Sequence, residues 1–153
     1  MVKIIQNGAL TGLISGVLMG FLMKLFQRLF QKDVYTLLLN IDFIPYFGTI
    51  TFSETVEFIF HLLVALIIGI IFVCIAQKYK VATLRNLFLL SFVLTFPTIF
   101  LYFPLTTLAI KETPGVTDYF AFILWAIAHL FFALFIPICY LLLQRVLKSQ
   151  KPK

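Results

Sequence analysis

The sequence has few charged residues and few cysteines. Only 12% of its 153 residues are charged, whereas 62% are hydrophobic and 17% are aromatic. A soluble domain carries about 25% charged residues, so this composition excludes an ordinary water-soluble protein. The two cysteines, Cys74 and Cys139, lie inside apolar stretches and form no CxxC pair. This excludes a disulfide framework and favours their role as small hydrophobic residues.

The sequence also lacks the short motifs of common enzymes. It contains no HExxH, no GxSxG and no glycine loop in a setting that could bind phosphate. We therefore expect no enzymatic activity and no catalytic residue, and we predict no cofactor. The first apolar stretch has no small-residue cleavage site, so we expect it to stay in the protein as a membrane anchor.

Long apolar stretches are what the sequence does have. About twenty apolar residues are needed to cross ~30 Å of hydrocarbon. Four stretches meet this length, near 5–26, 56–77, 85–109 and 119–143. The sequence therefore predicts an all-α fold: a polytopic integral membrane protein in which residues 1–153 form a single four-transmembrane-helix bundle.

The basic residues predict the orientation, because they favour the cytoplasmic ends of membrane spans. Four spans would place most of them on one side: Lys3, Lys78, Lys80, Arg85, Arg145, Lys148, Lys151 and Lys153. The other side receives all six acidic residues: Asp33, Asp42, Glu54, Glu57, Glu112 and Asp118. We predict a plasma (inner) membrane protein with both termini, and a basic tail over 144–153, in the cytoplasm. The composition, rich in Ile, Leu, Phe and Lys, is typical of a bacterial source.

The net charge is +6, and the basic residues adjoin the ends of predicted spans rather than lying on a folded domain outside the membrane. It predicts contact with the lipid bilayer, and with anionic lipid headgroups on the cytoplasmic face, rather than binding of nucleic acid. The outer loop, about 27–55, contains apolar runs at 34–39 and 44–48. These runs predict an interfacial segment that lies on the membrane surface or caps the bundle.

A ladder of glycines marks the first predicted span. Gly8, Gly12, Gly16 and Gly20 recur every four residues and trace a groove along one side of the helix. Such a ladder indicates close helix packing within a membrane. Two partners stay open: another helix of the same chain, or the first helix of a second copy in a homo-oligomer.

Polar residues inside the predicted spans are costly and mark candidate sites. In the second span, Glu54, Glu57 and His61 lie near one helical face. The fourth span carries His129 near its midplane. A polar stripe on the third span should face inward, and it consists of Ser91, Thr95, Thr98 and Tyr102.

The candidate proton or cation site therefore comprises Glu54, Glu57, His61, Thr98, Tyr102 and His129. His61 and Glu57 are the best candidates for metal ligands, and Lys24 and Arg28 are the expected charge partners of the carboxylates. Three interpretations compete: a structural network, a proton- or cation-responsive site, and intramembrane catalysis. We predict a non-enzymatic membrane protein whose polar cluster responds to protons or binds a small cation. The alternative is a small transporter or channel subunit, assembled through the glycine ladder.

Several segments resemble the YagU-like family of small, largely uncharacterised bacterial inner-membrane proteins. They are the stretch from Gly12 to Lys24, the span that begins with His61, residues 103–105, and His129 with the leucine after it. The resemblance covers most of the chain and implies a four-span membrane protein with both histidines at family-like positions. Trp125 departs from the family pattern, which has an acidic residue one turn before the last histidine. A carboxylate partner for His129 within its own helix is therefore missing.

Overall fold

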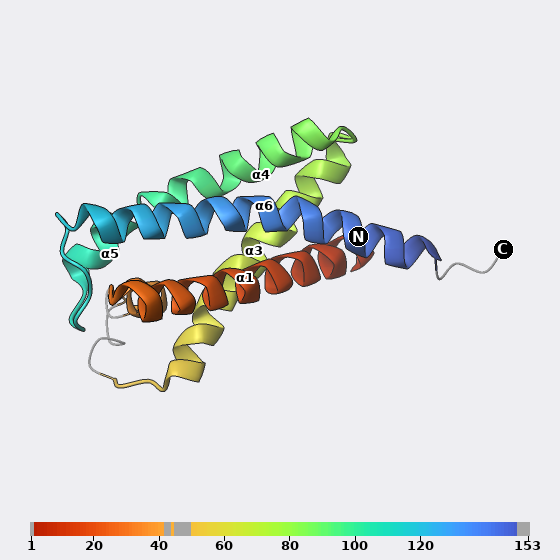
Figure 1. Ribbon diagram of the computed structural model, residues 1–153. Coiled ribbons are helices and arrows are strands. Elements are labelled where there is room, and N and C mark those ends of the chain that lie inside the picture. The colour runs from red at the N-terminus through yellow and green to blue at the C-terminus, as the bar shows by residue number, and fades with distance from the viewer. Residues whose placement is uncertain (1, 42–43, 45–49, 150–153) are drawn as a thin grey trace.

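The computed structural model describes residues 2–41, 44 and 50–149 of the chain (Figure 1). In this part the chain is all-helical, and its helices are α1 (Val2–Phe30), α2 (Val34–Leu39), α3 (Glu54–Lys78), α4 (Leu84–Ile99), α5 (Tyr102–Leu108) and α6 (Tyr119–Ser149). Some residues named above lie outside the described part: Asp42, residues 45–48 of the apolar loop, Lys151, Lys153 and the side chain of Lys148.

Four helical stretches are long and apolar enough to cross a membrane. They are α1, α3, α4 together with α5, and α6, and they coincide with the four predicted spans. The helices extend beyond the predicted limits. For example, α1 continues to Phe30 because most residues of its last two turns are Lys, Leu, Gln or Arg, which are good helix formers.

The third predicted span is broken into α4 and α5. Pro97 and Pro104 each lack the N–H group that a continuous helix would bond to the carbonyl four residues earlier. Between them the chain tightens, and the Phe100 N–H bonds only three residues back, to the Pro97 carbonyl, at 3.2 Å. The Ile99 carbonyl, at the break, accepts a hydrogen bond from the Trp125 indole N–H of α6 at 3.1 Å.

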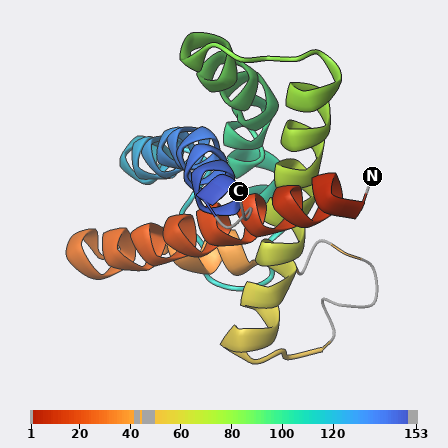
Figure 2. The ribbon, with the colours of Figure 1, turned by 90° about the vertical axis from the view of Figure 1, so that its right-hand side faces the viewer.

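The helix α6 lies in the middle of the molecule, with α1 on one side and α4 on the other (Figure 2). The helix α3 packs mainly on α1, which it crosses at a steep angle, and it contacts α4 much less (Figure 2). The helix α1 begins, and the helix α6 ends, at the same end of the bundle, which we call the terminal end (Figure 1). The opposite end, with α2 and α5, is called the loop end.

The glycine ladder of α1 packs against α3 of the same chain. A Cβ atom at Gly8 or Gly12 would overlap the backbone of α3, and one at Gly69 of α3 would lie 2.5 Å from the Gly12 Cα. Gly16 and Gly20 face side chains of α3. Because α3 covers this face, the ladder has no room for a second copy of α1.

The short helix α2 caps the loop end of the bundle. Its Val34 and Leu37 side chains are fully buried. The side-chain oxygen of Gln27, in α1, accepts hydrogen bonds from the backbone N–H groups of Tyr35 and Thr36 at 2.9 Å each. Gln27 thus satisfies free N–H groups at the start of α2, the task that a capping residue next to the helix normally performs.

Candidate functional site

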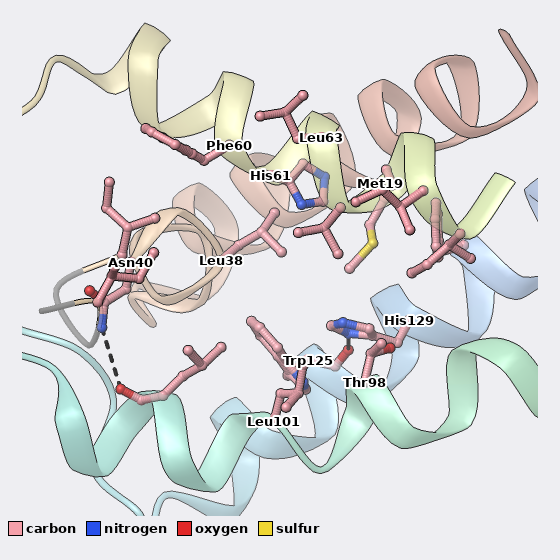
Figure 3. A pocket seen from close by; sticks show the side chains of 18 residues that line it. Met19, Leu38, Asn40, Phe60, His61, Leu63, Thr98, Leu101, Trp125 and His129 are labelled. Carbon is pink, nitrogen blue, oxygen red and sulfur yellow. Dashed lines mark hydrogen bonds between the residues drawn. The ribbon is translucent and has the colours of Figure 1, made fainter. Parts of the chain in front are cut away.

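A cavity of about 280 Å³ lies between α3 and α6 (Figure 3). Most of its wall is aliphatic or aromatic, with Met19 of α1 and Leu38 of α2 among the lining residues. Its polar lining residues are Asn40, His61, Thr98, Trp125 and His129. We call it the histidine cavity. Figure 3 shows the two imidazoles on opposite walls, with His61 on α3 and His129 on α6.

The position of the His129 ring is set by Trp125, one turn earlier on α6. The His129 Nδ1 lies 2.9 Å from the Trp125 carbonyl oxygen. The two rings also stack, with centroids 4.4 Å apart and planes inclined by 39°. Trp125 in turn is held by its hydrogen bond to the broken α4–α5 segment. The imidazole is therefore held by contacts within α6, and these contacts are in turn held by the hydrogen bond from Trp125 to the α4–α5 segment.

These contacts also fix the tautomers of both histidines. A carbonyl oxygen only accepts hydrogen bonds, so the neutral His129 ring carries its proton on Nδ1 and keeps Nε2 as an acceptor. The His61 Nε2 lies 3.2 Å from the Gly16 carbonyl oxygen, so His61 donates from Nε2 and keeps Nδ1 as an acceptor. Neither acceptor nitrogen has a hydrogen-bond partner among the described residues.

The remaining polar lining groups are already engaged. The Thr98 hydroxyl donates to the Thr95 carbonyl at 2.5 Å, within its own helix. The Asn40 side-chain amide donates to the Leu105 carbonyl of α5 at 3.3 Å. These bonds use donor groups of the wall, and each of the two imidazoles keeps one ring nitrogen as an acceptor.

The structure divides the predicted proton or cation site into separate places. His61, Thr98 and His129 share the histidine cavity. Glu54 and Glu57 line a different cavity at the loop end. Tyr102 joins neither, because its buried hydroxyl donates to the carbonyls of Gly115 at 3.0 Å and Asp118 at 3.2 Å. The rest of the predicted stripe, Ser91 and Thr95, is buried as expected.

The second cavity, of about 260 Å³, is lined by charged residues of α1 and α3 and by residues of α2. We call it the polar pocket. The expected pair of Lys24 and Glu54 is present, with Nζ and Oε1 2.5 Å apart. Glu57 instead forms an ion pair with Lys111. Burial, and then the hydrogen bond from its hydroxyl to Glu54, raise the pKa of Tyr35.

The two best candidates for metal ligands do not lie together, since Glu57 lines the polar pocket and His61 the histidine cavity. Among residues 2–41, 44 and 50–149, no group of three His, Cys, Asp or Glu side chains is placed to hold a metal ion. The arrangement can instead offer hydrogen-bond acceptors to a ligand in an apolar cavity.

Several residues of these sites were not expected from the sequence, among them Trp125 of the histidine cavity, Tyr35 of the polar pocket and Lys111, the partner of Glu57. Trp125 stood out only as a departure from a family pattern. Its spacing of four from His129 was a usable signal, because side chains four apart on a helix are neighbours. Lys111 lies in the segment between α5 and α6, and its ion pair depends on how that segment folds back over α3.

Comparison with protein-family models, with curated proteins and with solved structures finds no match for the chain. The resemblance to the YagU-like family therefore stays a prediction, carried by the segments given above.

Proposed function

We propose that the chain is a multi-pass integral membrane protein that binds, in the histidine cavity, a small apolar molecule with a hydroxyl group. Four candidate spans support insertion in a membrane. Their outward faces are apolar, as the exposed side chains of Ile67 (54%), Val93 (58%) and Ile123 (51%) illustrate. Such a surface is unfavourable in water and suits the hydrocarbon of a bilayer.

The orientation belongs to the same proposal. The described acidic residues lie in the segments that join α1 to α3 and α5 to α6, or in the first turn of α3, and these parts are at the loop end (Figure 1). Basic residues lie in the first turn of α1, at the end of α3, in the first turn of α4 and near the end of α6, and these helix ends are toward the terminal end (Figure 1). We place the terminal end in the bacterial cytoplasm, beside anionic headgroups of the plasma membrane. The loop end, capped by α2, then faces the outside.

The free acceptor nitrogen of His129 is the observation that carries the proposed ligand. His129 is only 5% exposed, and its Nε2 belongs to a cavity with mostly apolar walls. Because this nitrogen opens into the cavity and has no hydrogen-bond partner among the described residues, the O–H group of a ligand can donate to it. His61 offers a second acceptor on the opposite wall. Two acceptors favour a hydroxyl over a carbonyl or an ether, which have no proton to donate.

The rim of the cavity indicates how such a ligand enters. Four apolar side chains of the lining, Leu63, Val64, Ile67 and Leu101, are between 45% and 54% exposed. They come from α3 and from the α4–α5 break, two parts of the bundle that contact one another little. In a membrane this opening faces the lipid chains, so the ligand is a molecule that dissolves in them.

The predictions of a proton response, of cation binding and of an oligomeric channel have less support. Glu54 and Glu57 each hold a lysine in the polar pocket, so they do not supply negative charge next to His129. The glycine ladder that would assemble an oligomer is covered by α3. The geometry favours a neutral ligand with a hydroxyl group.

Trp125 makes the proposal testable, because it is the only tryptophan in the sequence and it lines the cavity. Purified protein in lipid nanodiscs is titrated with an isoprenoid alcohol and, separately, with its methyl ether, while Trp125 fluorescence is recorded. The alcohol should bind at least about tenfold more tightly, as expected for one additional hydrogen bond of about 1.4 kcal/mol.

Variants assign this preference to a residue. His129→Leu should bind the alcohol and the ether equally, whereas the control Phe131→Leu, at an outward position of the same helix, should keep the preference. Thermal unfolding shows that each variant is folded. Equal binding of the two probes by the unchanged protein, or a preference that survives in His129→Leu, would show that the proposal is wrong.

A further inference from the structure

The polar pocket lies next to an apolar groove at the loop end. The groove has a volume of about 220 Å³, and Phe21 of α1 and Phe58 of α3 form its apolar part. It shares Lys24, Tyr35 and Glu54 with the polar pocket. A charged pocket and an apolar groove therefore lie on either side of the bonded residues Lys24, Glu54 and Tyr35, and this pairing matches the chemistry of an amphiphile.

One basic side chain that lines the polar pocket forms no ion pair with the described residues. Glu54 is paired with Lys24 and Glu57 with Lys111. Arg28, an exposed residue, also lines the pocket, and its guanidinium forms no ion pair within 4 Å and no hydrogen bond with any residue that the structure describes. The hydrogen bond from Lys24 lowers the pKa of Glu54, and the charge of Arg28 helps to lower it further. Two cations and two carboxylates line the pocket, and Lys111, which does not line it, neutralises Glu57. With Lys111 counted, the group carries one positive charge in excess, and Arg28 is its side chain with the most hydrogen-bond donors.

We infer that the pocket and groove together bind a phospholipid, with its phosphodiester on Arg28 and part of an acyl chain against Phe21 and Phe58. The inference rests on the proposed membrane insertion, but not on the proposed ligand of the histidine cavity. It places a lipid at the loop end. The sequence predicted anionic headgroups at the opposite, basic terminal end.

Three features select this ligand. The planar fork of a guanidinium matches two oxygens of a phosphate, and Arg is the usual residue for this bidentate contact. One excess positive charge balances the single negative charge of a phosphodiester. Phe21 is 65% exposed and lies one turn before Lys24, so an apolar chain beside the headgroup would cover it. A free anion would leave this groove empty.

Native mass spectrometry of the full chain in detergent tests the inference. The probes are dioleoyl phosphatidylglycerol, dioleoylglycerol and inorganic phosphate. The protein should retain phosphatidylglycerol in preference to dioleoylglycerol, and millimolar phosphate should not displace it. Arg28→Gln should weaken the retention by at least about tenfold, the effect of one charge-assisted hydrogen bond. Arg28→Lys keeps the charge but loses the planar guanidinium. Its retention of phosphatidylglycerol should lie between that of the unchanged protein and that of Arg28→Gln.

Matched variants distinguish binding at this site from nonspecific effects of charge and hydrophobicity. Arg145→Gln removes an exposed arginine from α6 outside the pocket and should keep the lipid. Phe21→Ser should weaken lipid binding, whereas Leu25→Ser, an exposed apolar position outside the groove, should not. Equal retention by Arg28→Gln and Arg145→Gln would overturn the inference. So would displacement of the lipid by phosphate, which indicates a site for a free anion.

The test is independent of the histidine cavity, because His129→Leu should retain phosphatidylglycerol as the unchanged protein does. Extraction of membranes with alkaline carbonate separately shows whether the chain is an integral membrane protein. A chain that resists extraction yet binds no phosphatidylglycerol overturns the lipid site and leaves the proposed membrane insertion intact.

Discussion

Asp118 joins three parts of the chain at the start of α6. Its Oδ1 accepts a hydrogen bond from the Ala121 N–H at 3.0 Å, which caps the helix. Its Oδ2 lies 2.7 Å from the Lys32 Nζ, and its backbone carbonyl accepts the Tyr102 hydroxyl. The hydrogen bond from Lys32, followed by that from Ala121, holds the pKa of Asp118 below its usual value.

This lowered pKa predicts a loss of stability in acid. A carboxyl group with a lower pKa in the folded protein contributes its full stabilisation above the unfolded value of about 3.9. The contribution disappears as the pH falls through the lower, folded pKa. At pH 7 Asp118→Ala should reduce the free energy of unfolding by about 1 kcal/mol, as for a lost cap. Reversible unfolding in mixed detergent, measured from pH 7 to pH 3, checks both effects.

Two comparisons isolate the charge of Asp118. Asp118→Asn keeps a capping oxygen and loses only the charge, so the difference in stability from the unchanged protein should shrink toward zero in acid. Glu112→Gln changes an exposed carboxyl group next to the same segment and should have no effect. An acid dependence that is identical in Asp118→Asn would contradict the assignment.

At the scale of the helices, the contact of α1 with α3 depends on the absence of side chains. Gly12→Leu would force the two backbones apart and should reduce the stability by about 1–3 kcal/mol, the usual cost of overpacking. Thermal unfolding in detergent measures this loss. Ile14→Leu, at a position of α1 that is 41% exposed, is the control and should leave the unfolding temperature unchanged.

The same variant distinguishes the two partners that the sequence left open for the glycine ladder. If Gly12→Leu keeps its stability but changes the molecular mass measured by sedimentation, the ladder joins two copies of the chain rather than α1 and α3.

The helices illustrate what could be read from the sequence. Length and apolarity were enough for the four candidate spans, because each property belongs to the segment itself. The segment of α2 was predicted as an interfacial element that lies on the membrane surface or caps the bundle, but its helix was not predicted, since the capping oxygen comes from Gln27 in the preceding helix. The partner of the glycine ladder could not be predicted either, because a groove does not identify the surface that fills it.

At the scale of the whole molecule, the positions of the chain ends predict which segments share a side of the membrane. In a background with Cys74→Ala and Cys139→Ala, a membrane-impermeant maleimide should label Lys80→Cys from one side. Gln31→Cys should react only from the other side. The environments of all four residues are known, because Lys80, Gln31 and Cys74 are exposed and Cys139 is buried. Labelling of both positions from the same side would contradict the spanning bundle.

The candidate site shows what spacing alone cannot give. Helical spacing placed Glu57 and His61 near one face of α3, and one common site was expected. Because α3 crosses α1 at a steep angle, one turn of helix separates two environments (Figure 2). Glu57 lies in the polar pocket and His61 in the histidine cavity. Crossing angles arise from packing between helices, and a single helix pattern does not contain them.

The exposed apolar rim of the histidine cavity has a consequence for how its occupancy is regulated. A guest that arrives sideways through Leu63 and Ile67 never crosses the aqueous phase. Filling of the cavity then follows the mole fraction of the guest in the surrounding bilayer, not its concentration in water. Dilution of the sample with buffer should leave the ligand bound, whereas addition of vesicles without ligand should remove the ligand from the protein.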